Sequence, residues 1–179
     1  MVMRRIPFRV RARVASSSEA GSLLENPGDA VLVERGRPRL IITRCPCGCG
    51  DLLTINLDGR AGKAWRYYDL RERPAVFPSV WRDTGCGSHF IVWRGNIYLF
   101  SRFDDGDGEE LPASERDTDD DVIYHALPTQ RFEHYADVAD RLGLIPWDVL
   151  SACRRLERKG VAIESWSLEP GNFKRSTDG

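Results

Sequence analysis

Three features of the sequence predict an α+β chain made of two different parts. Up to residue 103, apolar and polar side chains alternate in short runs separated by glycine and proline, as in strands joined by turns. Four of the five cysteines gather in two glycine-rich segments of that part. From residue 119 onward, apolar residues recur at helical spacing instead. We therefore expect domains at 1–103 and 119–179, joined by an acidic linker at 104–118.

The charge of the chain is divided in the same way. Residues 1–103 hold 17 lysines and arginines against 9 acidic residues, residues 104–118 hold 1 against 7, and residues 119–179 hold 8 against 11. An acidic stretch with glycine, proline and serine is typical of a solvated linker, with a docking segment for a basic partner as the alternative. No apolar run approaches the roughly 20 residues of a membrane span, so we expect no membrane contact.

The first part is predicted to be a small antiparallel β domain. Residues 8–14 alternate apolar residues with arginines, which indicates an edge strand whose charges discourage edge-to-edge pairing. A basic arm for nucleic acid or an acidic partner is the alternative interpretation. Residues 30–34 and 40–43 read as a hairpin. The further expected strands are 53–57, 65–70, 77–81, and the hairpin of 90–93 with 97–100.

The cysteine pattern predicts a metal site. Cys45, Cys47 and Cys49 lie within five residues, and Cys86 and His89 follow in a second segment. Core packing does not explain three thiols so close together, whereas the intervening proline and glycines can bend the backbone until the sulfurs converge. Tetrahedral zinc needs four ligands at about 2.0–2.3 Å. The crowding argues against disulfides, and reactive thiols remain the other alternative.

The ligand set decides which chemistry is open to this site. If all four cysteines bind zinc, the site is closed and structural, and His89 is left to act as a base; if His89 binds, one thiol is spare. Thiolates weaken zinc as a Lewis acid, and no H-E-x-x-H motif occurs, so we favour structural zinc. A serine paired with His89 is then the route to hydrolysis. Ser79 is preferred over Ser88, which in a strand would point away from His89. The alternative is that both serines are ordinary loop residues.

The second part is predicted to consist of helices followed by a β-hairpin. Residues 135–142 place Ala136, Ala139 and Leu142 at helical spacing and end at Gly143, and Pro146 suits the first residue of a longer helix. The other expected elements are a short helix at 121–127, a strand at 161–166 and a turn at 170–171. This order resembles a winged helix-turn-helix over residues 119–174.

A winged helix indicates DNA or protein binding. The second helix of the pair would enter a major groove, and its outward side is expected to offer Trp147, Ser151, Arg154, Arg155 and Arg158. Asp148 and the net negative charge of this part oppose DNA, and winged helices also dock proteins. We therefore expect a protein partner, with nucleic acid as the alternative. Cys153 is expected to be a buried small apolar residue.

The motifs also resemble a known family over residues 30–100. The run Cys45–Gly50, Trp65, Pro78-Ser79-Val80, the run 86–90 and the hairpin from Trp93 are similar to a bacterial family of small zinc-binding proteins, encoded beside ubiquitin-like conjugation genes. The resemblance implies peptidases that process or remove the modifier, with the modifier and its activating and conjugating enzymes as partners. The chain departs from that pattern at Gly87, where relatives carry a larger residue, and in its added second part. The motif residues are Cys45, Cys47, Cys49, Ser79, Cys86, Ser88 and His89.

Together these inferences predict a zinc-containing peptidase or deconjugase of a bacterial ubiquitin-like pathway. The expected catalytic residues are His89, Ser79 and Ser88. A non-catalytic zinc adaptor of the same pathway and a winged-helix DNA-binding regulator are the alternatives. Residues 1–14 lack the apolar core of a signal peptide, so we expect a cytoplasmic protein. The expected zinc ligands are Cys45, Cys47, Cys49 and Cys86.

Overall fold

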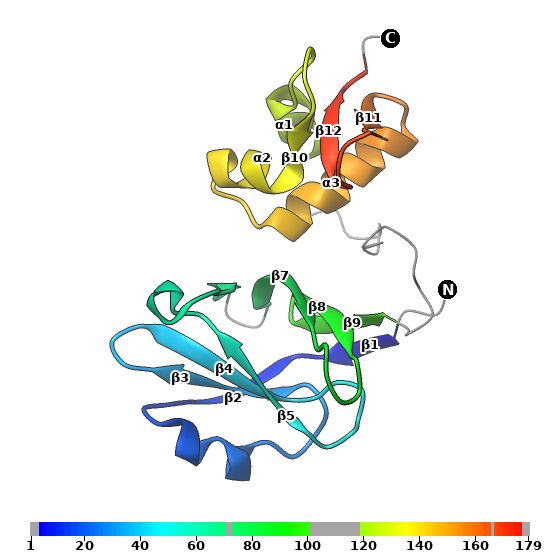
Figure 1. Ribbon diagram of the computed structural model, residues 1–179. Coiled ribbons are helices and arrows are strands. Elements are labelled where there is room, and N and C mark those ends of the chain that lie inside the picture. Colours follow the sequence, from blue (N-terminus) through cyan, green and yellow to red (C-terminus); the bar gives the residue numbers. More distant parts are fainter. Residues whose placement is uncertain (1–3, 71–72, 101–118, 166, 177–179) are drawn as a thin grey trace. The chain divides into compact units, whose positions relative to one another are not determined.

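The computed structural model describes residues 4–70, 73–100, 119–165 and 167–176. The chain divides into two compact units, Met1–Asp105 and Gly106–Gly179, and each is described by itself (Figure 1). The predicted acidic linker at 104–118 lies outside the described residues, and so does Trp166 of the predicted strand 161–166.

The first unit contains two β-sheets. The five-stranded sheet has the order β1-β9-β8-β7-β6 and the four-stranded sheet has the order β2-β3-β4-β5. The strands are β1 (Arg4–Pro7), β2 (Arg9–Val14), β3 (Asp29–Glu34), β4 (Pro38–Arg44), β5 (Leu52–Asn56), β6 (Arg66–Tyr68), β7 (Ala75–Trp81), β8 (His89–Trp93) and β9 (Asn96–Phe100). Three short 3-10 helices accompany them, η1 (Ser17–Glu19), η2 (Gly21–Leu23) and η3 (Gly59–Ala61). Of these strands, β1 was not predicted.

Strand β2 is an edge strand, as its alternating arginines predict, but it pairs with β3 in parallel. The expectation of a purely antiparallel domain is therefore wrong at this position. The reason lies in the segment between the two strands, which carries η1 and η2 and returns the chain to the beginning of β3. The other strand pairs of both sheets are antiparallel.

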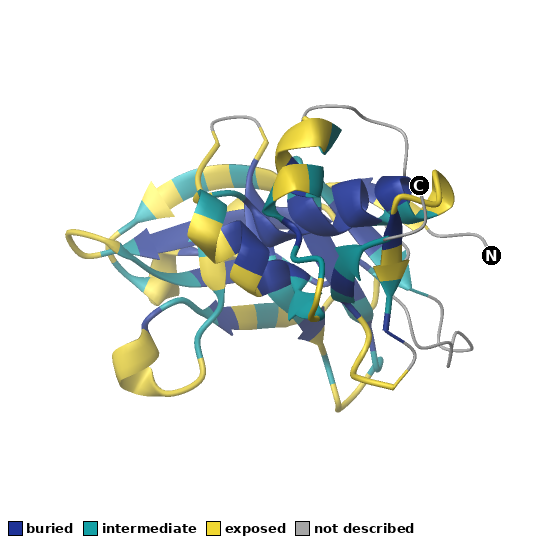
Figure 2. Cartoon of the chain, turned by 90° about the horizontal axis from the view of Figure 1, so that it is seen from above, coloured by how far each residue is buried: buried dark blue, intermediate teal, exposed yellow. Residues whose placement is uncertain are grey.

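The two sheets share one apolar core. Along β3, Ala30 and Leu32 belong to the cluster that also includes Val80 and Phe90 of the other sheet, whereas Val31 and Val33 pack with Leu24 on the opposite side. Both faces of β3 are thus covered. In Figure 2, fully buried strand segments are dark blue, whereas strands with one exposed face alternate in colour. The packing holds the ends of β4 and β7 in one body, and the functional site lies at those ends.

The second unit combines three α-helices with a three-stranded sheet among its described residues. Helix α2 (Tyr135–Leu142) ends at Gly143, whose φ of 67° is the left-handed conformation that glycine adopts without strain. Helix α3 (Pro146–Arg158) begins at Pro146, as predicted. The remaining elements are α1 (Asp120–Ala126), β10 (Glu133–His134), β11 (Ala162–Glu164) and β12 (Asn172–Arg175), with the sheet order β10-β12-β11.

The side of α3 that was expected to face outward is largely internal. Trp147 and Ser151 are buried, and the ring of Trp147 stacks near that of Tyr135. Arg155 is also buried; it donates to Ser151 Oγ at 2.9 Å and forms an ion pair with Asp120 of α1. The prediction of an open basic face was therefore wrong for these side chains. It failed because helix α1 packs on that side of α3 and supplies the carboxylate.

Arg154, Arg158 and Cys153 of α3 differ in burial and in pairing. Arg154 is half-buried and forms ion pairs with Glu157 and Glu164, while Arg158 is exposed. Cys153 is buried, as predicted, and burial raises the pKa of its thiol to about 12. The thiol is therefore an apolar packing group and not a nucleophile at neutral pH.

Candidate functional site

The structure brings Cys45, Cys47, Cys49 and Cys86 together. Their sulfur atoms all lie within 4.8 Å of one another, and none of the five cysteines is in a disulfide. Cys45 Sγ is 3.4 Å from Cys47 Sγ and 3.6 Å from Cys86 Sγ. A tetrahedral zinc ion with bonds of about 2.3 Å would separate its sulfur ligands by about 3.8 Å, so the spacing fits a metal ion with little adjustment.

The first cysteine segment is the connection from β4 to β5. The amide of Cys45 donates to the carbonyl of Asp51 at 2.8 Å, which closes the loop at its base. Inside the loop, the amide of Gly48 donates to the carbonyl of Cys45. Gly48 has a φ of 89°, a conformation that a residue with a side chain adopts only with strain. The sequence folds here as predicted, because glycine lets three cysteines share one tight turn.

The second segment is the connection from β7 to β8. The amide of Arg82 donates to the carbonyl of Ser88 at 2.9 Å, which fixes the two ends of this loop. A Cβ atom on Gly85 would lie 2.7 Å from the guanidinium of Arg82, so this glycine leaves room for the arginine to turn inward. A bound metal would therefore join the β4–β5 connection of one sheet to the β7–β8 connection of the other.

Arg82 borders the sulfur cluster. Its Nη1 lies 2.7 Å from Asp51 Oδ2 and 3.5 Å from Cys86 Sγ. Hydrogen bonding and charge from Arg82 lower the pKa of the Asp51 carboxyl. Four thiolates carry more negative charge than a divalent cation cancels, and a guanidinium beside them offsets the excess. Neither Arg82 nor Asp51 was predicted, because their meeting depends on the approach of two loops that are distant in sequence.

The thiols differ strongly in acidity. Burial, opposed by a hydrogen bond from Ser88, raises the pKa of Cys45 to about 12. At Cys86 burial also acts to raise the pKa, but hydrogen bonds from Ser88 and the neighbouring thiols lower it to about 6. Without a cation, the cluster therefore ionises in part. A metal ion would favour full ionisation, because it binds thiolates and displaces their protons.

Ser88 belongs to this cluster and not to an open cleft. It is buried, and its Oγ lies 3.0 Å from Cys86 Sγ and 3.5 Å from Cys45 Sγ. A hydroxyl in this position donates to thiolate sulfur. Its neighbour His89 begins β8, where successive side chains point to opposite sides, so Ser88 and the imidazole face apart as expected.

His89 is held between two aromatic rings. Its ring lies 5.0 Å from that of Trp81 at an interplanar angle of 20°, and 4.6 Å from that of Phe100 at 33°. These partners stand directly opposite it on β7 and β9. Burial lowers the pKa of the imidazole, so a neutral ring, which can accept a proton, prevails near pH 7. A carboxylate that could orient His89 would have to come from nearby, and Asp83, six residues earlier in the chain, is exposed and forms no hydrogen bond with His89 among the described residues.

Ser79 lies on the same strand as Trp81, two residues earlier. Trp81 is registered with His89, so regular alternation would make Ser79 a diagonal neighbour of His89, but Ser79 lies within the irregular stretch between Val76 and Val80. Diagonal neighbours are about 7–8 Å apart along the backbone, within reach of an imidazole. The register shifts between Val76 and Val80, and the indole of Trp65 donates to the Ser79 carbonyl at 3.1 Å.

The side chains of Ser79 and His89 are open to water. Neither makes a side-chain hydrogen bond to another described residue. Across the described ranges, the buried side-chain nitrogen or oxygen that lacks a partner is Arg39 Nε alone. Ser79 and His89 are half-buried, and their polar side-chain atoms are not among the fully buried, unpaired ones. The sequence identified both residues but not the aromatic rings that enclose the imidazole.

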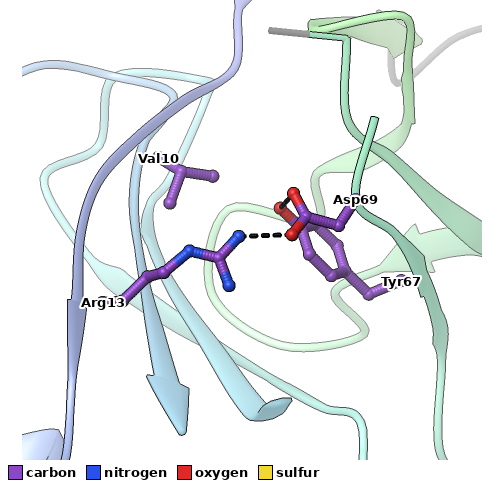
Figure 3. Close-up of a pocket in the computed structure, with 4 residues that line it drawn as sticks. All are labelled: Val10, Arg13, Tyr67 and Asp69. Atoms are coloured by element: carbon purple, nitrogen blue, oxygen red, sulfur yellow. Dashed lines mark hydrogen bonds and ion pairs between the residues drawn. The ribbon is translucent and has the colours of Figure 1, made fainter. Parts of the chain in front are cut away.

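A pocket of the first unit contains none of these residues. Its volume is about 340 Å³, and it is lined by Val10, Arg13, Tyr67 and Asp69 (Figure 3). Figure 3 shows Arg13 pointing to Asp69, with which it forms an ion pair. Because the charges of this pocket already compensate each other, it offers little to a charged ligand.

These features define a protein with a cluster of four cysteines that could hold a metal ion, and with a half-buried serine and histidine in the same unit. The model of a family described as a bacterial ubiquitination-like system serine protease (BubE) matches residues 16–100. The match covers both cysteine segments, Ser79 and His89, and supports a protease role in such a system. No curated protein and no solved structure matches the chain significantly. Within the described ranges, no helix is both long and apolar enough to cross a membrane.

The comparison corrects the predicted function. A zinc-containing peptidase or deconjugase was expected, with an adaptor and a DNA-binding regulator as alternatives, whereas the matching family is described as a serine protease. The nucleophile of that class is a hydroxyl, and a metal forms no part of the description. The error came from the cysteines. They form the strongest motif of the chain, and the function was therefore named after the metal that they predict.

Proposed function

We propose that the chain is a serine protease of a bacterial ubiquitin-like system, in which Ser79 is the nucleophile and His89 the general base. The observation that carries the proposal is the pairing of Trp81 with His89 across β7 and β8, because Ser79 stands two residues before Trp81 on the same strand. Both lie inside the segment that is similar to a serine protease family. The proposed partners are the ubiquitin-like modifier and its activating and conjugating enzymes.

The chemistry follows from these two side chains. Ser79 Oγ attacks the carbonyl carbon of the scissile bond while His89 takes the hydroxyl proton. The tetrahedral intermediate collapses, and His89 gives that proton to the departing amine, which leaves Ser79 acylated. Water then attacks the ester, with His89 again accepting and returning one proton. The lowered pKa of His89 suits this cycle, because the resting imidazole must be neutral.

Zinc is the ion that we propose for the cysteine site. Four sulfur donors with spacings of 3.4 Å and 3.6 Å fit its tetrahedral preference, and thiolates favour zinc over harder cations. With four thiolate ligands, zinc would have no open position and would be structural. Ser88 and Arg82 would support the sulfurs by hydrogen bonding. The site would hold the β7–β8 connection, and with it the strand ends that carry Ser79 and His89.

For residues 119–179 we propose a winged helix-turn-helix that docks a protein partner. The order of α1, β10, α2, α3, β11 and β12 agrees with this module. Protein contact is favoured over DNA because Arg154 and Arg155 are already engaged in ion pairs. Residues 1–103 would form the protease domain and 104–118 the linker. Cysteine thiols outside disulfides suit a reducing cytoplasm.

Two measurements test the catalytic proposal. A fluorophosphonate probe reacts with activated serines without any knowledge of the substrate, and mass spectrometry then locates the label. We expect labelling at Ser79 in the wild type, and its loss in Ser79→Ala and His89→Ala with metal content unchanged. The second measurement is cleavage of a fusion of the modifier to a reporter protein, which should fall at least 1,000-fold in the same variants.

The controls separate the two serines. Ser88→Ala should keep the Ser79 label although it weakens the metal site, and Ser22→Ala, in an exposed 3-10 helix, should change neither measurement. Labelling at Ser88, or full cleavage by Ser79→Ala, would refute the assignment. A wild type that neither reacts nor cleaves would leave a non-enzymatic role in the pathway.

A further inference from the structure

Trp81 is the most exposed of the large apolar side chains that the structure describes. It is 71% exposed, more than Leu70 or Leu168 at 52%, although Trp93 and Trp147 are buried. An exposed indole at the end of a strand contributes little to the core, and it lies next to the proposed catalytic pair. This position suggests a role in the reaction and not in folding.

One face of the Trp81 indole packs against the imidazole of His89. Trp81 stacks on the imidazole of His89 at 20°, and Phe100 covers the imidazole from the neighbouring strand at 33°. The three residues occupy directly opposed positions on β7, β8 and β9. Rotation of the imidazole out of this arrangement would meet one ring or the other.

This arrangement replaces a partner that serine proteases usually have. In a catalytic triad, a carboxylate bonds to the histidine and fixes its orientation. Among the described residues, no carboxylate bonds to His89. The aromatic rings supply the orientation instead, by stacking and not by hydrogen bonding.

The other side of the indole faces solvent. A peptide whose scissile carbonyl reaches Ser79 in extended form advances about 3.3 Å per residue, and Trp81 stands two residues from Ser79 on the same face. The indole is therefore placed to meet the substrate residue about two positions from the cleaved bond. Apolar side chains and flat peptide backbone are the groups that pack on such a ring.

We propose that Trp81 is a positioning and specificity residue of this site. One face of its ring orients the His89 imidazole, and the other contacts an apolar, extended segment of the substrate next to the scissile bond. This inference rests on the proposed function, since it assigns the substrate contact of the same site. It goes beyond that function because it names the chemical class of segment that the site accepts.

The experiment compares Trp81→Ala and Trp81→Phe with Leu70→Ala, which removes another exposed apolar side chain of the first unit. One measurement is the NMR shift of the His89 ring protons, assigned by their absence in His89→Gln. A stacked indole shifts these protons upfield, so Trp81→Ala should move them downfield and Trp81→Phe only partly. The other measurement is kcat and KM for the modifier–reporter fusion.

We expect Trp81→Ala to lower kcat/KM at least tenfold, with a lower kcat from the misoriented base and a higher KM from the lost contact. Trp81→Phe should restore most of kcat but less of KM, because it keeps a stacking ring of smaller area. Leu70→Ala should match the wild type. Unmoved His89 shifts together with kinetic constants within twofold of wild type in Trp81→Ala would overturn the inference.

The outcomes separate this inference from the function on which it rests. If the wild type cleaves and Ser79 is labelled, but Trp81→Ala is normal in both measurements, only the role of Trp81 is wrong. If the wild type does not cleave and Ser79 is not labelled, the proposed protease function is wrong, and the proposed role of Trp81 is wrong as well.

Discussion

Arg82 Nη1 lies 2.7 Å from Asp51 Oδ2, and this ion pair joins the two cysteine-bearing loops at the rim of the sulfur cluster. The same Nη1 lies 3.5 Å from Cys86 Sγ. One guanidinium thus contacts a carboxylate from the β4–β5 connection and a sulfur from its own β7–β8 connection. The metal site and the proposed catalytic strands are therefore mechanically connected.

Substitution of Arg82 should weaken metal binding without removing a ligand. In Arg82→Met, the thiolates lose a neighbouring positive charge and Asp51 loses its partner, so we expect zinc affinity to fall about 10–100-fold. Competition with a chelator of known affinity measures the change. Arg60→Met is the matched control, because Arg60 also pairs with a carboxylate, Asp58, but elsewhere in the unit. Equal affinities in all three proteins would contradict the role of Arg82.

Loss of a cysteine ligand should destabilise the first unit. Cys86→Ser removes a sulfur that lies within 4.8 Å of the other three, and we expect metal content below one ion per chain together with a lower Tm. Each kcal/mol lost lowers the Tm of a domain of this size by about 4–8 °C. Elemental analysis and calorimetry measure both effects. Cys153→Ala is the control, since that buried thiol lies outside the cluster, and it should keep the metal.

The pH dependence of cleavage should reflect His89. Burial lowers the pKa of its imidazole below the ordinary value of 6.5, and only the neutral ring can accept the serine proton. The rise of kcat/KM with pH should therefore have its midpoint below 6.5, so that activity has levelled off by pH 7. A pH–rate profile on the modifier–reporter fusion measures this midpoint. A midpoint well above 6.5 would show that another group titrates or that His89 is not the base.

Asp29 should make the fold sensitive to acid. Burial acts to raise the pKa of its carboxyl, but hydrogen bonds from Arg11 and from the amides of Asn26 and Glu25 outweigh it and lower the pKa. The folded pKa is below the unfolded one, so the stabilisation is present above about pH 4 and is lost as pH falls through the folded pKa.

The variant Asp29→Asn tests this linkage. It should lower the free energy of unfolding by about 1–3 kcal/mol at pH 7, and the difference from wild type should shrink in acid. Urea unfolding at several pH values measures both. Asp83→Asn removes an exposed carboxylate and should match the wild type throughout. A deficit that stays constant down to pH 2 would assign the loss to packing and not to charge.

Much of the local structure could be predicted because it depends on neighbours in the sequence. Alternation of apolar and polar residues located most strands of the first unit, and helical spacing located α2 and α3, with Gly143 and Pro146 at their boundaries. Strand β1 was missed because its four residues show no alternation, and it is a strand only through its pairing with β9.

Site residues were predictable where residue type alone carries the chemistry. Cys45, Cys47, Cys49 and Cys86 converge as their spacing suggested, because glycine-rich turns have few ways to fold. The outward face of α3 was mispredicted, since helical spacing does not reveal that α1 provides a carboxylate for Arg155. The functional class was mispredicted because the cysteine motif, which indicates a metal, was used to name the class, whereas the matching family is described by its serine.

The sequence by itself determined the α+β class, the cluster of four cysteines and the candidacy of Ser79 and His89, because these depend on side-chain chemistry and short-range spacing. Tertiary structure alone decided which groups meet. It turned Ser88 toward sulfur, stacked Trp81 on His89, and brought Arg82 to Asp51. These contacts come from strand register and from the packing of two sheets, in which residues far apart in the chain are placed within a few ångströms of each other.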